Sequence, residues 1–249
     1  MEQHLPICPA FAGIPAIAER YGVNVDIVQL LVMVLAYINR ASSRTGASAT
    51  SPAGNASIPS KDNGDITFHA SPEDILQLKS HSDKYTPEFK ADVRACMTEV
   101  LKLVKTPLNE DDRVDVVQLL GTLNTNMHGD PDDLIFGLFP GLSMLCHSCD
   151  PNCVYTINNG TVTVRTSRRV DSQEELSISY IYDLGMSRWR RRNILLQHRF
   201  FHCACARCVR EESGSDFFES FRCANSKCSG LVRVPTDDQT ISADQACVI

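Results

Sequence analysis

The feature that most restricts how this 249-residue chain can fold is a group of three cysteines within six residues, Cys203, Cys205 and Cys208. Zinc in proteins prefers four thiolates or imidazoles arranged as a tetrahedron, so three closely spaced thiols are an incomplete metal site. A bound ion would also close a loop that has little else to hold it. The cluster therefore predicts that a ligand from another part of the chain folds against residues 203–208.

A second cysteine-rich stretch, earlier in the chain, can supply that ligand. Residues 137–153 read GLFPGLSMLCHSCDPNC, with three cysteines and one histidine in the last eight positions. On spacing alone, four residues compete for the role of fourth ligand, namely Cys146, Cys149, Cys153 and His202. A second ion is a weaker prediction, because its candidate ligands Cys223, Cys228 and Cys247 would lack a fourth partner.

Composition indicates a globular protein of a reducing compartment. Hydrophobic residues make up 43% of the chain, which is enough for a core, and the net charge of -6 argues against nucleic-acid binding by bulk electrostatics. We find no signal-peptide pattern at the N-terminus, and no apolar run approaches the roughly 18 residues of a membrane span. Eleven cysteines in such a chain are more often metal ligands than disulfides.

The first half of the chain is predicted to be mostly helical. Apolar residues recur with helical spacing, and Ser71 followed by Pro72 is typical of a helix start. The stretch 41–65 is rich in Ser, Thr, Ala, Gly and Asn, which predicts a flexible loop. The expected helices lie at about 24–40, 72–81, 86–105 and 110–123.

The pattern then changes to short strands and a final helix. Residues 154–157 and 161–165 flank an Asn-Gly turn, which predicts a β-hairpin, and residues 176–180 alternate as a strand does. Residues 187–198 form a basic helix, whose arginines we interpret as a solvated face. The side chain of Asn152 is expected to fix its turn by hydrogen bonds to the backbone.

These segments, in this order, resemble the C-terminal half of a SET-domain lysine methyltransferase, most closely its SET and MYND branch. The run from His147 to Asn152, HSCDPN, resembles the NHSCxPN motif of that family, and EELSISY, ending at Tyr180, resembles GEELxxxY. The CxCxxC cluster resembles the post-SET zinc cluster. The resemblance extends over residues 112–230, whereas residues 1–111 agree with the family only in layout.

The resemblance implies an α+β fold: a SET-domain β-clip of short strands, with a helical insert before it and a post-SET zinc loop after it. Residues 1–22, with His4 and Cys8, would correspond to the tail of a MYND zinc finger. The remaining parts would be a helical insert at 23–111, a C-terminal SET region at 112–183, a post-SET helix and zinc cluster at 184–230, and a tail at 231–249.

The resemblance also implies which residues act. Tyr180 would be the catalytic residue, whose hydroxyl orients the amine of the substrate lysine. S-adenosylmethionine would be contacted by Asn126, Cys146, His147 and Phe201. Zinc would be held by Cys149, Cys203, Cys205 and Cys208.

Three positions depart from the family pattern. Cys146 stands where the family has an asparagine that contacts the cofactor, Gln173 replaces a glycine, and Arg199 replaces an expected tyrosine. Nothing in residues 1–22 resembles the N-terminal SET strands with their glycine-rich turn.

Two functions follow from these observations. The first is a protein-lysine N-methyltransferase acting on a histone or non-histone protein. The alternative is a catalytically inactive, zinc-stabilised SET-like interaction module. In either case we expect a monomer of the nucleus or the cytosol that binds a protein partner and neither nucleic acid nor a membrane.

Overall fold

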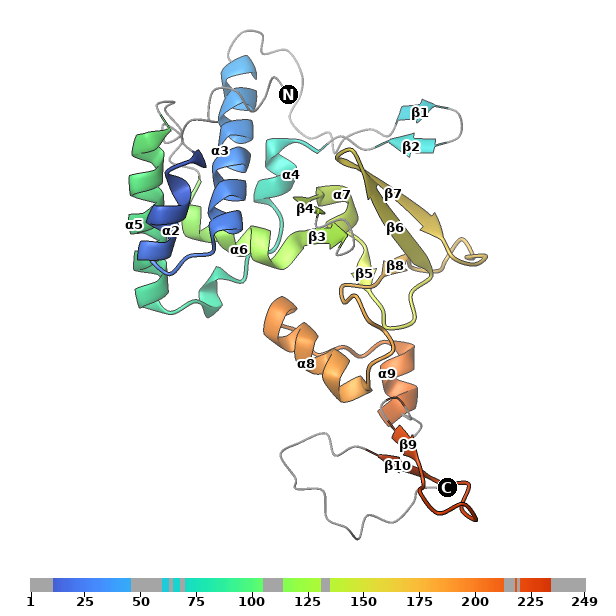
Figure 1. Cartoon of the computed structure of the whole chain (residues 1–249). Helices are drawn as coiled ribbons and strands as arrows, with labels where there is room; N and C mark the ends of the chain where they lie inside the picture. The colour runs from blue at the N-terminus through green and yellow to red at the C-terminus, as the bar shows by residue number, and fades with distance from the viewer. Residues whose placement is uncertain are drawn as a thin grey trace. The chain divides into compact units, whose positions relative to one another are not determined.

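The structure of the chain, a computed structural model, describes residues 11–45, 60–62, 65–67, 70–104, 114–130, 135–212, 218 and 220–233. The predicted finger-tail residues His4 and Cys8 and the candidate ligand Cys247 lie outside these ranges. The chain forms two compact units, of which the first comprises Met1–Met127 and Gly137–Ser143 and the second His128–Phe136 and Met144–Ile249 (Figure 1).

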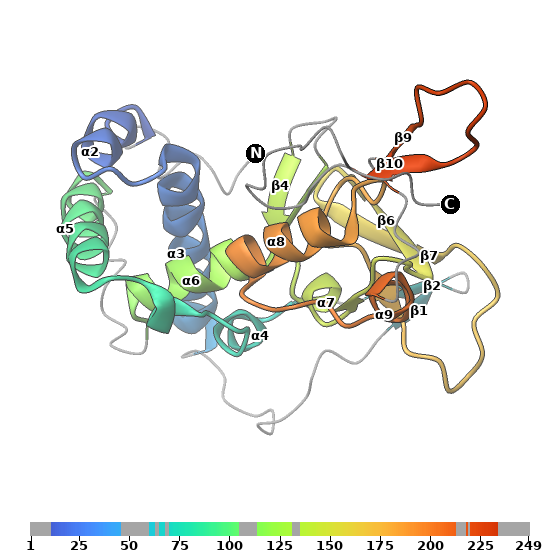
Figure 2. The same ribbon diagram turned by 90° about the horizontal axis from the view of Figure 1, so that it is seen from below.

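A helical core organises the first unit. Its longer helices are α2 (Ile14–Arg20), α3 (Val25–Thr45), α5 (Pro87–Leu103) and α6 (Val116–Asn126). Helix α2 contacts α3 and α5, and α6 contacts the same two helices, so the four helices surround one apolar interior (Figures 1 and 2). The residues in that interior recur at helical spacing, for example Val28, Leu31, Val32, Leu35 and Ile38 of α3.

Side-chain caps set where several of these helices begin. Thr86 accepts a hydrogen bond from the backbone N–H of Phe89 at the start of α5, and Asp115 accepts one from Val117 at the start of α6. The short helix α4 (Pro72–Leu76) begins with a capping box between Ser71 and Asp74. The cap at Asp115 explains why α6 begins six residues later than the predicted position 110.

The prediction of a helix over 72–81 is wrong beyond Leu76. Ser80 turns back to α6, where its hydroxyl donates to the carbonyl of Gln118 at 2.7 Å. His81 then adopts a left-handed conformation with φ of 54°, and a 3-10 turn, η1 (Ser82–Lys84), follows. Contact with another helix thus overrides the local helical preference.

The expected loop at 41–65 is also wrong in part. Helix α3 continues to Thr45, and β1 (Ser60–Asp62) pairs antiparallel with β2 (Asp65–Thr67). The rest of that predicted loop lies outside the described residues.

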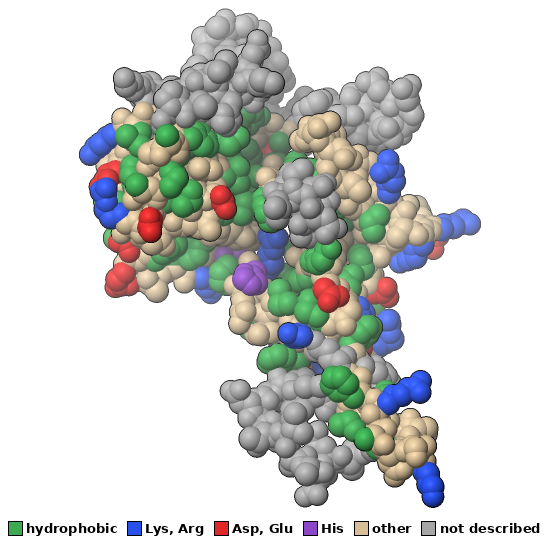
Figure 3. Space-filling model, viewed as in Figure 1, with side chains coloured by type: hydrophobic (Ala, Val, Ile, Leu, Met, Phe, Trp, Pro, Cys, Tyr) green, Lys and Arg blue, Asp and Glu red, His purple; other side chains and the backbone are tan. Residues whose placement is uncertain are grey.

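On the face of the first unit seen in Figure 3, acidic and basic side chains are interspersed.

Short strands lead from the first unit into the second. Strands β3 (Met127–Asp130) and β4 (Ile135–Leu138) form a two-stranded sheet, and the short helix α7 (Pro140–Ser143) follows. Because α6 and α7 belong to the first compact unit, the units do not follow the predicted boundary at residue 112, and the SET region 112–183 remains a prediction.

The second unit contains the predicted hairpin. Strand β6 (Cys153–Asn158) pairs antiparallel with β7 (Thr161–Thr166), and Asn159 and Gly160 both have positive φ angles, as a tight hairpin turn requires. Strand β5 (Cys146–His147) pairs in parallel with β8 (Ser177–Ile178), which is shorter than the predicted strand 176–180. Each sheet in the described residues has two strands.

The C-terminal elements of the second unit surround a small core. Helix α8 (Arg188–Arg199) ends at Phe200, and α9 (Ala206–Arg210) and the hairpin of β9 (Ser220–Arg222) and β10 (Leu231–Arg233) follow (Figure 2). The buried core residues here are Cys149, Ile181, Leu195, Cys203 and Cys208. Sulfur therefore occupies much of a core that is poor in hydrocarbon.

The α+β prediction is confirmed, with helices first, short strands next and a cysteine cluster last. Within the described residues no single helix is long and apolar enough to cross a membrane. The pair Ile14–Arg20 and Val25–Ala41 passes that test only jointly, with a bend of 119° between its two parts.

The contact of α6 with Ser80 gives a first prediction. A Cβ added to Gly121 would lie 2.5 Å from the backbone oxygen of Ser80, so Gly121→Ala must push backbone apart. We expect it to lower the free energy of unfolding by about 2 kcal/mol in urea titrations, since overpacking a rigid contact is destabilising. Gln118→Ala, at an exposed position of the same helix, is the control and should change stability little. Equal stabilities of the two variants would contradict the close contact.

Candidate functional site

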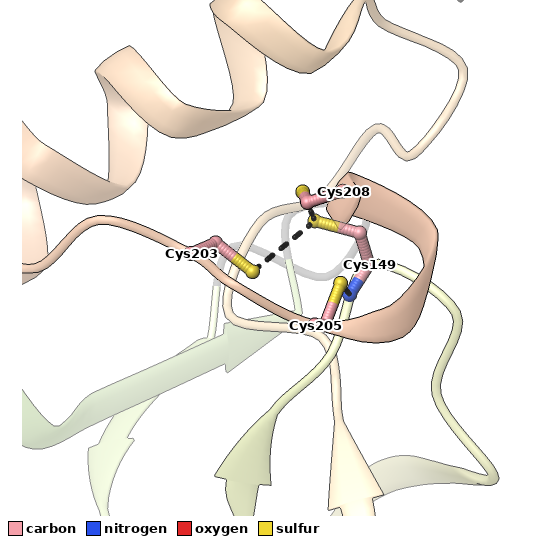
Figure 4. A group of neighbouring side chains, drawn as sticks. All are labelled: Cys149, Cys203, Cys205 and Cys208. Carbon is pink, nitrogen blue, oxygen red and sulfur yellow. Dashed lines mark hydrogen bonds between the residues drawn. The ribbon is translucent and has the colours of Figure 1, made fainter. Parts of the chain in front are cut away.

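Four cysteines meet in the second unit. The sulfur atoms of Cys149, Cys203, Cys205 and Cys208 all lie within 4.8 Å of one another. The Cys149 sulfur is 3.8 Å from that of Cys203 and 3.6 Å from that of Cys208, and the Cys149 backbone N–H donates to the Cys205 sulfur (Figure 4). Among the described residues, the rivals Cys146, Cys153 and His202 do not belong to this group.

The donor set fits a zinc ion. A tetrahedron with Zn–S bonds of about 2.3 Å has S···S edges of about 3.8 Å, which agrees with the separations of the Cys149 sulfur from the Cys203 and Cys208 sulfurs. The four cysteines are free thiols and not disulfides. A hydrogen bond from the Cys149 thiol lowers the pKa of Cys203, which favours a thiolate at this position.

Local structure brings the fourth thiol to the other three. Cys149 lies two residues after the end of β5. The turn after it is fixed by Asn152, whose Oδ1 accepts from the N–H of Ser177 and whose Nδ2 donates to the carbonyl of Glu175. These two hydrogen bonds between the Asn152 side chain and the backbone are the structural role that the sequence predicted for this residue. On the other side, Cys205 precedes α9 and Cys208 lies within it.

A buried pair of arginines stands beside the thiols. Arg191 has 0% exposure, forms an ion pair with Glu211 and lies near the thiols of Cys149 and Cys208. Arg207 donates through Nε to Glu211 at 2.7 Å and through Nη1 to the carbonyl of Cys149 at 2.9 Å. Two cations and one carboxylate leave a positive balance, which favours an anionic thiolate cluster.

This arrangement corrects the interpretation of the basic helix as a solvated face. Arg191 is the largest of the fully buried side chains, although its neighbour Arg190 is exposed. The buried Nε of Arg191 and Nη2 of Arg207 have no hydrogen-bond partner among the described protein atoms. Sequence reasoning missed Arg191 because nothing in a run of arginines distinguishes the one that faces inward.

Tyr180 lies just beyond β8, with its ring half-buried. Its hydroxyl donates to the carbonyl of Leu145 at 2.5 Å, and its ring meets that of Phe201 edge-on at 6.3 Å. The guanidinium of Arg199 lies 5.4 Å from the ring centroid. Burial raises the pKa of Tyr180, so the hydroxyl keeps its proton at neutral pH and serves as a donor.

Two of the predicted cofactor residues surround Tyr180, and a third lies on the adjoining strand. The ring of His147 lies 5.3 Å from that of Tyr180 and 6.0 Å from that of Phe201. Cys146 is exposed on β5, and a hydrogen bond to the Glu175 carboxylate raises the pKa of its thiol. The second unit thus brings together Cys146, His147, Tyr180 and Phe201.

Asn126, the remaining predicted cofactor residue, belongs to the first unit. It ends α6, and its amide nitrogen donates to the carbonyls of Lys79 at 2.7 Å and Thr122 at 2.8 Å. Both amide hydrogens are therefore used within that unit, which leaves the Oδ1 atom for any other contact.

His128 is a residue near Tyr180 that the sequence analysis missed. Its imidazole is 4% exposed and meets the rings of Tyr155 and Tyr180 edge-on, each at 5.7 Å. Burial, and to a lesser extent Arg199, lower the pKa of His128 to about 4, so the ring is neutral. The sole sequence signal was its position two residues after Asn126, which could not reveal burial.

The grouping of the four thiols predicts that the protein binds one zinc ion at this site. We expect Cys208→Ser to contain one zinc ion fewer per chain than the unchanged protein, because a tetrahedral site with three thiolates binds zinc far less tightly. Zinc is measured by mass spectrometry after dialysis. Cys146→Ser is the matched control, since its thiol comes from the same cysteine-rich stretch but lies outside the cluster. Equal zinc loss in both variants would mean that the ligand set is different.

Burial of a neutral His128 predicts a pH dependence of stability. Between pH 4 and pH 6.5 the unfolded chain binds a proton at this histidine and the folded chain does not, so acid lowers the free energy of unfolding. The contribution is on the order of 3 kcal/mol over the full window. His128→Phe keeps an aromatic ring, and we expect its stability to fall less between pH 7 and pH 5 in urea titrations. His198→Gln, at an exposed site of α8, should retain the original slope, and a parallel curve for His128→Phe would contradict the burial effect.

Comparisons with known proteins agree with this geometry. The chain is 38% identical over 107 residues to "Histone-lysine N-methyltransferase ASHR1" of Arabidopsis thaliana, a match that covers 41% of this chain and 22% of that protein. It is 39% identical over 80 residues to human "Histone-lysine N-methyltransferase SMYD3", covering 32% and 18%. It is 31% identical over 150 residues to Drosophila melanogaster "SET domain-containing protein SmydA-8, isoform A", covering 55% and 31%.

The chain therefore spans between about a fifth and a third of the length of these relatives. The family described as "SET domain" matches residues 37–181, which is more than half of the chain. With its short strands and the cysteine cluster that follows them, the chain belongs to the SET domain family.

Proposed function

We propose that this chain is the C-terminal part of the catalytic region of a protein-lysine N-methyltransferase that uses S-adenosylmethionine. The observation that carries the proposal is the grouping of Tyr180, His147 and Phe201 directly beside the four thiols. The names of the Arabidopsis and human relatives, both histone-lysine N-methyltransferases, support it. A catalytically inactive module has no observation of its own in its favour.

The proposed acceptor is the amine of a lysine side chain in a histone or non-histone protein. Free in water this amine has a pKa near ~10.4 and carries a proton, so it cannot act as a nucleophile. The half-buried rings of Tyr180 and Phe201 and the buried, neutral His128 form a partly desolvated environment, to which Arg199 adds a positive charge. Loss of water there lowers the pKa of an ammonium group and favours the neutral amine.

Tyr180 would orient that amine. Its proton is directed to the carbonyl of Leu145, so the oxygen presents its lone pairs to other groups. A lone pair that accepts an amine hydrogen fixes the direction of the nitrogen lone pair. Alignment of a nucleophile in this way replaces the random encounter of two reactants and can supply much of the rate.

The residues beside Tyr180 also fit S-adenosylmethionine, which when bound supplies a methyl group on a positively charged sulfur. Phe201 offers a partly exposed aromatic ring for an adenine, and His147 and Cys146 lie on an adjoining strand with Cys146 exposed. The thiol of Cys146 is a weaker hydrogen-bond donor than the amide it replaces. We assign contacts with the cofactor to these three residues of the second unit.

Zinc has a structural role in this proposal. Four thiolate ligands fill the tetrahedral coordination of the ion and leave no open position for a substrate, as in closed structural sites. The cluster joins residues 203–208 to the turn after β5, where few apolar side chains are available. We further propose that the protein acts in the nucleus or the cytosol.

Removal of the Tyr180 hydroxyl tests the proposed chemistry. We expect Tyr180→Phe to lower transfer of tritiated methyl groups from S-adenosylmethionine to core histones by about 100-fold or more, the usual effect of losing a group that orients a reacting atom. The metal-loaded protein is used throughout. Tyr155→Phe, which removes another half-buried hydroxyl of the same unit, should retain activity within a few-fold. Equal turnover of Tyr180→Phe and the unchanged protein would remove Tyr180 from the mechanism.

Calorimetry separates an inactive module from an enzyme with an untested substrate. Binding of S-adenosylmethionine to the zinc-loaded chain with a Kd in the micromolar range supports the proposed function even if histones are not substrates. An absence of binding would favour the inactive interaction module.

A further inference from the structure

The imidazole of His147 connects the thiol cluster to the tyrosine site. Its Nδ1 lies 3.0 Å from the backbone nitrogen of Tyr180, and its Nε2 lies 3.3 Å from the sulfur of Cys149. One ring thus contacts the residue proposed to orient the substrate and a ligand of the proposed metal. Both contacts lie within the second unit.

The backbone of Tyr180 determines which nitrogen of His147 carries the proton. A backbone N–H can only donate, so Nδ1 must be the unprotonated acceptor. The proton of the neutral ring is then on Nε2, which faces Cys149. The sulfur of Cys149 is therefore the acceptor in this pair.

The strength of the second hydrogen bond depends on the state of the sulfur. A thiolate accepts hydrogen bonds more strongly than a neutral thiol, because the acceptor carries charge. A metal ion keeps its cysteine ligands deprotonated. The Nε2–H···S bond should accordingly be strongest when the four-cysteine cluster holds its ion.

We propose that His147 is a positioning residue that couples metal occupancy of the cysteine cluster to the conformation of Tyr180. With a metal thiolate at Cys149, both ring nitrogens are satisfied and the imidazole is held in one orientation. The fixed Nδ1 then holds the Tyr180 backbone, and with it the hydroxyl at the Leu145 carbonyl. When the metal leaves, the Nε2–H···S bond to Cys149 weakens, and the bond from the Tyr180 N–H to Nδ1 loses its support.

This coupling deepens the proposed function, on which it rests for the role of Tyr180. It also differs from a simple requirement for zinc in folding. Residues 203–208 reach the tyrosine site through Phe201 as well, whose ring is 6.3 Å from that of Tyr180. A test must therefore separate the route through His147 from the route through the chain.

Two substitutions of His147 each keep one of its two hydrogen bonds and remove the other. The side-chain oxygen of His147→Asn can take the place of Nδ1 and accept from Tyr180, but the shorter side chain cannot reach Cys149. The amide of His147→Gln can take the place of Nε2 and donate to Cys149, without an acceptor at the Nδ1 position. Both variants carry a side-chain amide, but His147→Asn keeps the contact with Tyr180 and His147→Gln keeps the contact with Cys149.

The readouts are amide hydrogen exchange at Tyr180 and zinc affinity measured by competition with a chromophoric chelator. In the unchanged protein we expect zinc removal to speed exchange at Tyr180 by about tenfold, as loss of one supported hydrogen bond predicts. His147→Asn should bind zinc about tenfold more weakly, since outer hydrogen bonds to metal ligands have that effect. Its exchange at Tyr180 should no longer respond to zinc, although residues 203–210 still respond.

His147→Gln should show the opposite pattern, with nearly unchanged zinc affinity and fast exchange at Tyr180 whether or not zinc is bound. Amides of the β6–β7 hairpin serve as the internal reference for general loosening of the unit. The proposal is overturned if Tyr180 exchange responds to zinc equally in His147→Asn and in the unchanged protein, or if zinc removal leaves it unaffected in both. Neither readout uses S-adenosylmethionine or a substrate, so failure of the coupling and failure of the proposed methyl transfer are separate results.

Discussion

The second unit depends on the meeting of Cys149 with the three thiols of residues 203–208. Its buried C-terminal core contains three cysteines and two aliphatic residues, Ile181 and Leu195, so burial of hydrocarbon alone contributes little there. Neighbouring thiolates repel one another, and a divalent cation at their centre reverses that repulsion. In the proposed zinc-bound state the ion would hold the turn after β5 to the segment after α8, together with the hydrogen bond from Arg207 to the carbonyl of Cys149. Phe201 would thereby keep its place beside Tyr180.

The charges around the cluster are consistent with this dependence. A zinc ion with four thiolates carries a net charge of about -2, which is costly to bury without a neighbouring cation. Arg191 supplies a fully buried guanidinium, and Arg207 supplies another that bridges Glu211 and the carbonyl of Cys149. Helix α8 thus does more than cover the site, because one of its inward-facing residues offsets the charge of the ligands.

The sequence predicted most accurately those features that depend on local spacing. The CxCxxC pattern identified three of the four thiols that the structure brings together, and the family resemblance of the HSC segment selected Cys149 from four candidates. The Asn-Gly turn identified the β6–β7 hairpin. Features that depend on tertiary contacts were missed. Helix α4 ends early because Ser80 contacts α6, Arg191 faces inward from a basic run, and His128 is buried between two tyrosines. None of these contacts has a signature in the residues next to it, because each is made with a residue distant in sequence.

The departures from the family pattern also acquire a physical meaning at the tyrosine site. Arg199 replaces an expected tyrosine, and its guanidinium lies over the ring of Tyr180 at 5.4 Å, so the position still provides a group that packs on that ring. Unlike a tyrosine, it adds positive charge, which together with burial keeps His128 neutral. In the proposed reaction the same charge disfavours a protonated lysine and so favours the nucleophilic amine. The same charge also opposes the approach of the sulfonium group of the cofactor. Arginine at this position would therefore lower the affinity for the cofactor while raising the fraction of substrate lysine in its neutral, reactive form.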